Sequence, residues 1–297
     1  MFRGAFTALV TPIRGDRLDV AALEAIVEQQ IAAGIHGLVP CGTTGEAATL
    51  SMDEHLQVIE VVVRAAGGRV PVLAGAGSNS TAEAIELTKA CKELGATGTL
   101  QVTPYYNKPP HAGLVRHFTT IADAVDLPMI VYNVPGRTAL DMRPETIAEC
   151  AKHPNVRGVK EATADMGRVT RLRELVKRED FDVLSGDDFT ILPFLACGGH
   201  GVISVVSNPA PAVIAGLVNA WREGDFVKAL SLHDAQFPLT RSLFLETNPI
   251  PVKTAMSMLG LCSDEMRSPL LPLDADAPIR KQVQHELVRL GLLPRSA

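Results

Sequence analysis

The sequence is poor in the features that mark several large classes of protein. Its 297 residues contain no run of like charges, only 4% are aromatic, and the net charge is −5. Without a basic patch, nucleic acid and anionic membranes are poor candidate partners, and a small-molecule ligand is expected instead. No segment reaches the roughly 18 apolar residues of a membrane span, and the N-terminal apolar run is too short for a secretory signal. We therefore expect a cytoplasmic protein.

Cysteine is scarce and metal-binding patterns are missing. The cysteines are Cys41, Cys91, Cys150, Cys197 and Cys262, an odd number without a CxxC pair. Buried free thiols are therefore expected, and neither disulfides nor a zinc site is predicted. Gly75-Ala76-Gly77 lacks the third glycine of a dinucleotide motif, and Asp187-Asp188 has no accompanying ligand set. We expect no cofactor and no metal.

What the sequence does contain is a repeated pattern of strand and helix. Eight short β-rich runs each end in a cluster that contains Gly, Pro, Thr, Asn or Asp. Most of them precede an amphipathic segment that a glycine closes. Eight such units predict an α/β fold, a (β/α)8 TIM barrel of parallel strands. The expected strands are 5–11, 37–41, 70–75, 98–103, 128–133, 156–160, 181–185 and 201–205.

The residues that follow the eighth unit predict three further helices, within 225–246, 251–260 and 278–291. No low-complexity linker precedes them. We therefore expect residues 1–224 to form the barrel with its active site, and residues 225–297 to form a C-terminal helical region packed on the barrel.

Lys160 stands directly after the apolar run 156–159. The ordinary explanation is that it lies just past the strand and extends to water. Active sites of such barrels lie at the C-terminal ends of the strands, however, and those ends here carry hydroxyls, phenols and an arginine. We therefore interpret Lys160 as an amine nucleophile, which has to be neutral in order to attack.

Other strand ends carry candidates for substrate binding. Residues 42–46, GTTGE, could bind a carboxylate through adjacent hydroxyls and backbone N–H groups, or could be a turn in which Thr44 caps a helix. Tyr132 ends an apolar strand, so its hydroxyl faces either solvent or a site. Arg137 could be an exposed loop cation or could clamp a carboxylate with two parallel donors.

Six motifs together resemble a known family. They have the order and spacing of the pyruvate-dependent class I aldolase superfamily, and the chain is most similar to its dihydrodipicolinate synthase family. The resemblance covers essentially the whole chain, including FLETNPIPVK at 244–253. The motifs are GTTGE at 42–46, PYYNKPP at 104–110, YNVPGRT at 132–138, GVKEAT at 158–163, SGDD at 185–188 and GGHGVISV at 198–205.

The resemblance implies a reaction and a role for each motif. The reaction condenses pyruvate with L-aspartate 4-semialdehyde to 4-hydroxy-tetrahydrodipicolinate, the first step of the diaminopimelate and lysine branch. Lys160 would form a Schiff base with pyruvate. Tyr132 would transfer protons, linked through Thr43 to Tyr106 of a neighbouring subunit. The residues that would bind the substrates are Thr44, Arg137, Gly186 and Ile203.

The resemblance also implies an assembly and a regulator. A relay across an interface requires a homo-oligomer, and the family's usual form is a tetramer built as a dimer of dimers. L-lysine would inhibit by binding near the relay tyrosine, at Ala48, His55, Asn79, Glu83 and Tyr105. Ala47 and Met52 replace a serine and a histidine of the lysine-sensitive pattern, so partial, weak inhibition is expected.

Two other functions remain open at this point. A lyase for 2-keto-3-deoxy sugar acids or N-acetylneuraminate would use the same Lys160 and Tyr132 to run the reverse reaction, a cleavage that releases pyruvate. Such relatives usually lack the counterpart of Arg137. A barrel without catalysis could serve as a structural or regulatory protein. The presence of all five candidate residues, Lys160, Tyr132, Thr43, Tyr106 and Arg137, argues against that second function.

Overall fold

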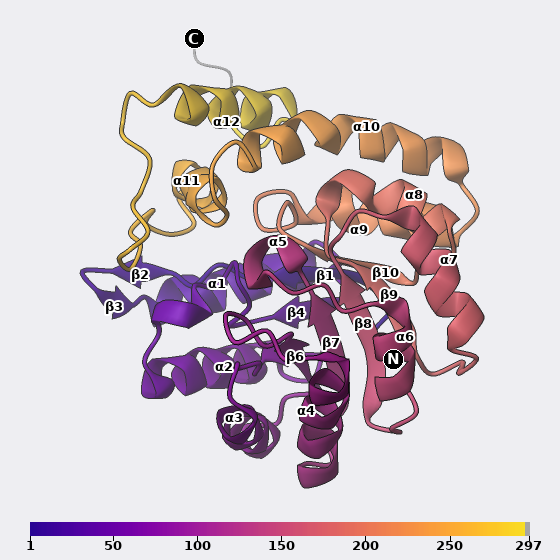
Figure 1. The fold of residues 1–297 in the computed structure, drawn as a ribbon. Coiled ribbons are helices and arrows are strands. Elements are labelled where there is room, and N and C mark those ends of the chain that lie inside the picture. The colour runs from indigo at the N-terminus through magenta and orange to yellow at the C-terminus, as the bar shows by residue number, and fades with distance from the viewer. Residues whose placement is uncertain (295–297) are drawn as a thin grey trace.

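Eight parallel strands form the centre of the structure, a computed structural model that describes residues 1–294 (Figure 1). They are β1 (Gly4–Ala8), β4 (Gly37–Val39), β5 (Leu73–Gly75), β6 (Gly98–Val102), β7 (Met129–Asn133), β8 (Val156–Glu161), β9 (Asp182–Ser185) and β10 (Gly201–Ser204). Their order is β4-β1-β10-β9-β8-β7-β6-β5, and a parallel bridge from Leu38 to Val72 closes the ring. The predicted (β/α)8 TIM barrel is confirmed.

Most strands begin and end within two residues of the predicted positions, but the third begins at Leu73 and not at residue 70. The first strand was expected to reach residue 11 but ends at Ala8. Beyond Ala8 the backbone N–H of Val10 donates to the side chain of Asn208 instead of to a neighbouring strand. Because Val10 bonds the Asn208 side chain and not the backbone of a neighbouring strand, the strand ends although the sequence stays apolar up to this point.

Helices surround the barrel, and local caps explain where several of them begin. Ser51 and Glu54 form a capping box at the start of one helix, which Gly67 ends in the left-handed conformation. The helices are α1 (Val20–Ala32), α2 (Met52–Ala66), α3 (Thr81–Glu93), α4 (His111–Ala124), α5 (Pro135–Thr138), α6 (Pro144–Cys150), α7 (Met166–Leu175), α8 (Ile191–Ala196) and α9 (Pro211–Arg222). A small hairpin of β2 (Ile13–Arg14) and β3 (Arg17–Leu18) and two 3-10 turns, η1 (Ala47–Thr49) and η2 (Asp188–Thr190), complete this part.

The three predicted C-terminal helices are present as α10 (Phe226–Leu243), α11 (Ile250–Met258) and α12 (Pro278–Arg289). Helix α10 lies against α9, and α12 lies beside α10 and α11 (Figure 1). The division of the chain into two units at residue 224 stays a prediction. In residues 1–294, no helix combines the length and the apolar character needed to cross a membrane.

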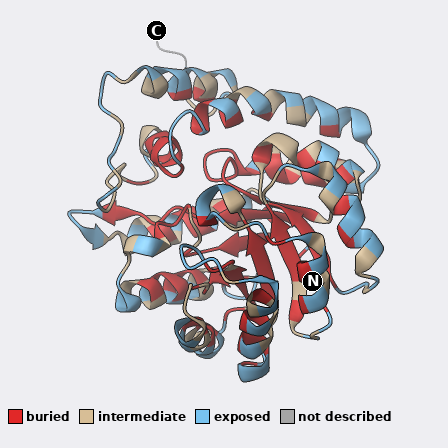
Figure 2. Cartoon of the chain, in the orientation of Figure 1, coloured by how far each residue is buried: buried red, intermediate tan, exposed pale blue. Residues whose placement is uncertain are grey.

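The core has two layers, one inside the barrel and one between the strands and the helices. Figure 2 shows the strands as buried and the outer helices as buried on one side only. The inner layer holds Phe6, Leu100, Ile130, Leu184 and Ile203 among others. All five cysteines are free thiols; four are buried as predicted, whereas Cys197 is only partly buried.

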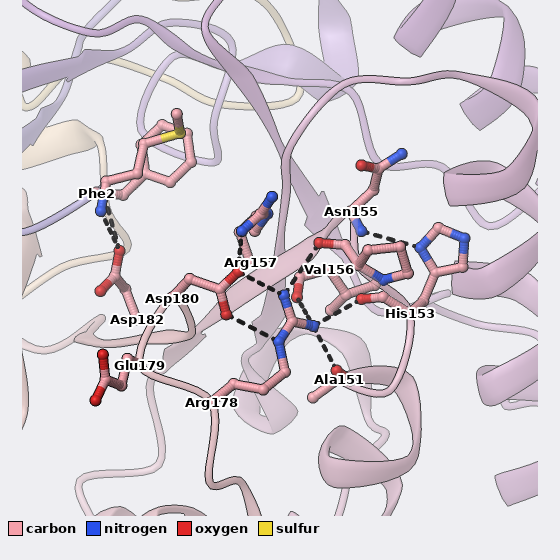
Figure 3. Close-up of polar contacts among 12 residues, drawn as sticks. Phe2, Ala151, His153, Asn155, Val156, Arg157, Arg178, Glu179, Asp180 and Asp182 are labelled. Carbon is pink, nitrogen blue, oxygen red and sulfur yellow. Dashed lines mark hydrogen bonds and ion pairs between the residues drawn. The ribbon is translucent and has the colours of Figure 1, made fainter.

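Polar contacts hold together the face of the barrel at which the strands begin (Figure 3). The carboxylate of Asp182 is buried and accepts from the backbone of Phe2 and from the side chain of Arg3, at 2.8 and 2.7 Å. Arg178 donates to the backbone carbonyls of Ala151, His153, Pro154 and Val156, just before or at the start of β8. These contacts join backbone groups of the N-terminus and of the segment before β8 to the side chains of Arg178 and Asp182.

Burial alone would raise the pKa of Asp182, but the hydrogen bonds from Arg3 and Phe2 outweigh it and hold that pKa below its usual 3.8. A carboxylate whose pKa is lower in the folded than in the unfolded state contributes its full stability at any pH above its unfolded-state pKa. That contribution is lost as the pH falls through its folded-state pKa. We expect Asp182→Asn to lower the free energy of unfolding by about 1.5 to 3 kcal/mol at pH 7, the loss typical of a hydrogen bond to a charged group. The deficit relative to wild type should shrink below pH 3.8, measured by denaturant unfolding at several pH values.

Asp180→Asn is the matched control, because Asp180 lies two residues away with its side chain half exposed beside Arg178. It should cost much less stability than Asp182→Asn. Equal losses from both variants, or a deficit independent of pH, would show that Asp182 does not act through its charge.

Candidate active site

One large cavity opens where the barrel strands end. Its volume is about 520 Å³, and its wall combines residues that follow four neighbouring strands with residues of the C-terminal region. The residues after β4 include Thr43, those after β6 include Tyr105, and those of β7 and α5 include Tyr132 and Arg137. The C-terminal region contributes residues 247–249. The mouth predicted from the barrel therefore exists, on the face opposite the contacts of Asp182.

Lys160 and Tyr132 lie side by side on adjacent strands. They are paired residues of β8 and β7, and the Nζ of Lys160 lies 4.2 Å from the centre of the Tyr132 ring. Each residue is only 6% exposed. Lys160 therefore does not extend to bulk water, and Tyr132 faces the cavity. The amine and the phenol are close enough for one small ketone to meet both.

Gly186, which follows β9, makes room for the Lys160 side chain. A Cβ atom at this position would lie 3.0 Å from Cε of Lys160 and 2.7 Å from Cβ of Ala162. Such distances are shorter than ordinary contacts, so any other residue here would displace the lysine. Ile203 lies on β10 in the same interior layer as Tyr132. Four of the predicted site residues lie outside the cavity wall itself: Thr44, Lys160, Gly186 and Ile203. Lys160 adjoins the cavity through Tyr132, which does line it.

Thr44 and Arg137 are joined by a residue that the sequence did not single out, Asn248. The Nδ2 of Asn248 donates to Oγ1 of Thr44 at 3.0 Å, and its backbone oxygen accepts from Nη2 of Arg137 at 2.9 Å. Arg137 lies in the short helix α5, not in an irregular loop. The alternative in which Thr44 caps a helix is wrong, because the turn η1 begins after Glu46.

Tyr106 lies at the surface and is not part of the cavity wall. It is 90% exposed and has a left-handed backbone with φ of 71°. The preceding Tyr105 is held by Asn79, whose Nδ2 donates to the Tyr105 carbonyl at 3.2 Å. Within residues 1–294, Thr43, Tyr132 and Tyr106 share no hydrogen bond, so one chain alone does not form the relay.

The residues considered for lysine binding line the same cavity. Ala48, His55, Glu83 and Tyr105 all belong to its wall, and Asn79 lies beside Tyr105. Glu83 accepts from the hydroxyl of Ser78 at 2.7 Å, and His55 bonds the carbonyl of Gly75 at 2.7 Å. Burial lowers the pKa of His55, so its ring is neutral at pH 7.

The two acids of SGDD have structural positions. Asp187 accepts from the backbone of Phe189 and caps η2. Asp188 is buried and accepts from the backbone N–H groups of Val205 and Val206 at the end of β10. Burial raises the pKa of Asp188 to about 6. In the part of the chain that the structure describes, no three His, Cys, Asp or Glu side chains form a possible metal site.

Sequence reasoning also missed a buried ion pair beneath the GTTGE turn. The Nζ of Lys253 lies 2.7 Å from Oε1 of Glu46, and both side chains are fully buried. The backbone N–H of Arg267 donates to the other carboxylate oxygen at 3.1 Å. The only sequence signal was the presence of Lys253 in the FLETNPIPVK segment, which by itself does not indicate a partner.

An amine buried at a strand end, a phenol beside it, and hydroxyl and guanidinium groups around one cavity define a lysine-dependent aldolase of class I. The chain is an enzyme of this lyase type. It belongs to the dihydrodipicolinate synthetase family, whose sequence model matches residues 1–288.

Individual relatives agree with this assignment. The chain is 56% identical over 273 residues to a 4-hydroxy-tetrahydrodipicolinate synthase of Maridesulfovibrio salexigens, covering 92% of this chain and 93% of the relative. It is similar to the chloride-inhibited dihydrodipicolinate synthase of Acinetobacter baumannii complexed with pyruvate, with a TM-score of 0.95, 43% identity, and 99% and 100% of the two chains covered. A lysine-bound enzyme of Cyanidioschyzon merolae has a TM-score of 0.94 at 40% identity, with 98% and 99% covered. These relatives support the synthase and not the sugar-acid lyase.

The crowding at Gly186 leads to a testable prediction. Gly186→Ala would place a Cβ atom 3.0 Å from Cε of Lys160, so that the lysine has to move by a few tenths of an ångström. We expect the rate of adduct formation with pyruvate, measured by borohydride trapping and intact mass, to fall by about 3- to 10-fold, because a displacement of about 1 Å would slow an oriented reaction on the order of 100-fold.

Gly136→Ala is the control, because a Cβ atom there would meet nothing within 4 Å. Its trapping rate should stay within about twofold of wild type. A Gly186→Ala variant that traps pyruvate as fast as Gly136→Ala would show that the lysine does not need this space.

Proposed function

We propose that this chain condenses pyruvate with L-aspartate 4-semialdehyde to give 4-hydroxy-tetrahydrodipicolinate, the first step of the diaminopimelate and lysine branch. The observation that carries the proposal is the buried amine of Lys160 next to Tyr132, whose side chain lines the cavity. The pyruvate complex of the Acinetobacter baumannii relative supports the first substrate. The free thiols are compatible with a reducing compartment, and we propose that the enzyme works in the cytoplasm.

The chemistry follows from the amine. Lys160 attacks the ketone carbon of pyruvate, and loss of water leaves a Schiff base between them. The positive nitrogen then withdraws electrons, so that the pyruvate methyl group can lose a proton and become a nucleophile. This carbon attacks the aldehyde and forms the new carbon–carbon bond. The amino group of the semialdehyde finally replaces Lys160 at the imine carbon, which closes the ring and releases the enzyme.

Tyr132 is placed to move the protons of these steps. Its ring lies against the Lys160 amine, and its side chain reaches the cavity that the substrates would enter. Thr44 would bind the pyruvate carboxylate, with Gly186 and Ile203 shaping the space around the adduct. Arg137 would bind the carboxylate of the semialdehyde through a charge-assisted hydrogen bond. Thr43 would connect Tyr132 to the partner's tyrosine.

The first test concerns the nucleophile. We expect Lys160→Ala to abolish the pyruvate adduct that borohydride traps, measured as the mass of the intact chain, because the reacting amine is removed. Lys108→Ala is the control, since Lys108 is an exposed loop residue after Tyr106 and should trap normally. Persistent trapping in Lys160→Ala would assign the Schiff base to another lysine.

The exposed Tyr106 supports an assembly of at least two chains. A large aromatic side chain that is 90% exposed, on a backbone with positive φ, is unfavourable unless something covers it. We propose that Tyr106 enters the mouth of a second copy, in a dimer that pairs again into a tetramer. Specific activity should then fall when the enzyme is diluted until sedimentation shows monomers. A monomer with full activity would exclude Tyr106 from the mechanism.

We also propose weak inhibition by L-lysine at the part of the cavity formed by Ala48, His55, Asn79, Glu83 and Tyr105. The lysine-bound relative from Cyanidioschyzon merolae supports such a regulator. Glu83 offers a carboxylate to an ammonium group, and Ala47 and Met52 offer no polar side-chain contact. Binding should therefore be several-fold to about 100-fold weaker than in lysine-sensitive members of the family.

Calorimetric titration with L-lysine checks this site. Glu83→Ala should weaken binding by about 10-fold or more, because it removes a charge-assisted pair. Glu86→Ala, another exposed acid of α3, should bind as wild type does. The site is wrong if wild type binds no lysine, or if the two variants bind it equally well.

A further inference from the structure

Asp188 is a buried carboxylate that the proposed chemistry does not use. It is only 1% exposed. Its Oδ1 accepts from the hydroxyl of Ser204, and its Oδ2 accepts from the backbone N–H groups of Val205 and Val206 at 2.8 and 3.3 Å. Within residues 1–294 it forms no ion pair with a cationic side chain. A buried charge without a cation is costly, so an acid at such a position indicates that its hydrogen bonds are needed.

These bonds join two strands at the point where the ladder between them has ended. Strands β9 and β10 are neighbours in the barrel (Figure 1), yet they share only two paired positions, Gly201 with Leu184 and Val202 with Ser185. The last residues of β10 therefore have no ladder partner on β9. The carboxylate of Asp188, which follows β9 in the chain, bonds the residues at and after the end of β10 instead. A side chain thus connects the loop after β9 to the end of β10.

Both of the connected ends pack close to the reacting pair. Gly186 lies two residues before the acid, and a Cβ atom there would lie 3.0 Å from Cε and 3.2 Å from Cγ of Lys160. The N–H of Gly186 donates to the carbonyl of Glu161, the residue after the lysine, at 2.8 Å. Ile203, the last residue of β10 before the bonded hydroxyl, lies in the same interior layer as Tyr132. A shift between the two strand ends would therefore change the space around the amine.

We propose that Asp188 is a positioning residue of the Schiff base step. By joining the loop after β9 to the end of β10, it holds Gly186 and Ile203 around the side chain of Lys160 and so supports the rate of adduct formation. Asp188 is not part of the cavity wall, so it acts through these residues and not on the substrate. This role rests on the proposed function, because the adduct with pyruvate is the first step of that reaction.

The test follows the time course of borohydride trapping by intact mass at several pyruvate concentrations. It yields a rate constant at saturating pyruvate, a half-saturating concentration, and the final fraction of chains that carry the adduct. Asp188→Ala leaves three donors without an acceptor. We expect its rate constant to fall by about 3- to 10-fold, because a displacement of about 1 Å would slow an oriented reaction on the order of 100-fold. The half-saturating concentration and the final fraction should not change, because the acid touches no substrate.

Two further variants keep the comparison specific. Asp188→Asn retains one acceptor oxygen for the backbone donors and should recover most of the wild-type rate constant. Asp187→Asn is the matched control, because the neighbouring acid accepts from Phe189 and Thr190 instead and should trap at the wild-type rate. If Asp188→Ala does not fold, Asp188→Ser replaces it, since its hydroxyl is too short to reach the three donors but lets a water molecule pair with them.

The outcomes separate this role from the proposed function. An unchanged rate constant in Asp188→Ala, whether or not the final fraction falls, overturns the positioning role alone, because a purely structural residue would change only the number of working chains. An equal loss of rate in Asp187→Asn also overturns it. A wild type that forms no adduct with pyruvate overturns the proposed function and the role together. A rate constant that falls in Asp188→Ala and recovers in Asp188→Asn, at an unchanged half-saturating concentration, establishes the role.

Discussion

The buried ion pair between Glu46 and Lys253 is the constraint on which the mouth of the barrel depends. Both side chains are fully buried, and the two residues are 207 positions apart in the chain. Removing one partner of such a pair costs about 3 to 5 kcal/mol, because the other charge is left without compensation. The pair therefore fixes the GTTGE turn against the segment 244–253. That segment in turn carries Asn248, which holds Thr44 and Arg137.

A second constraint comes from the alternation of side chains along the strands. Tyr132 and Lys160 point into the barrel, so the next residues, Asn133 and Glu161, point outward. There Asn133 donates to Glu161 and Asp141, and Arg168 donates to both acids. Burial raises the pKa of Glu161, while Arg168 and the hydrogen bonds oppose the rise. The outward network thus fixes the ends of the two strands whose inward residues form the reacting pair.

Local sequence patterns were sufficient for the barrel and for its central lysine, and insufficient for the contacts that position the site. The apolar run before Lys160 predicted a strand, and the barrel then predicted a mouth at its end. Asn248 and Lys253 have no such local signal, because their partners, Thr44 and Glu46, lie more than 200 residues away. One of the two readings of Arg137 placed it in a loop, yet Pro135 starts a short helix at that point. The position of Tyr106 in a relay requires a second chain and stays a prediction.

The mouth of the barrel holds unfavourable groups together with the contacts that keep them in place. Asp182 and Arg178 satisfy many backbone groups on the face where strands begin, far from the cavity. The mouth contains a buried lysine and the left-handed backbones of Cys41 and Glu46, next to the ion pair of Glu46 with Lys253. Groups of this kind reduce stability and persist where the rest of the fold determines the structure. At the mouth this support comes from the ion pair of Glu46 with Lys253 and from Asn248, which holds Thr44 and Arg137, so that the amine of Lys160 can stay buried beside Tyr132.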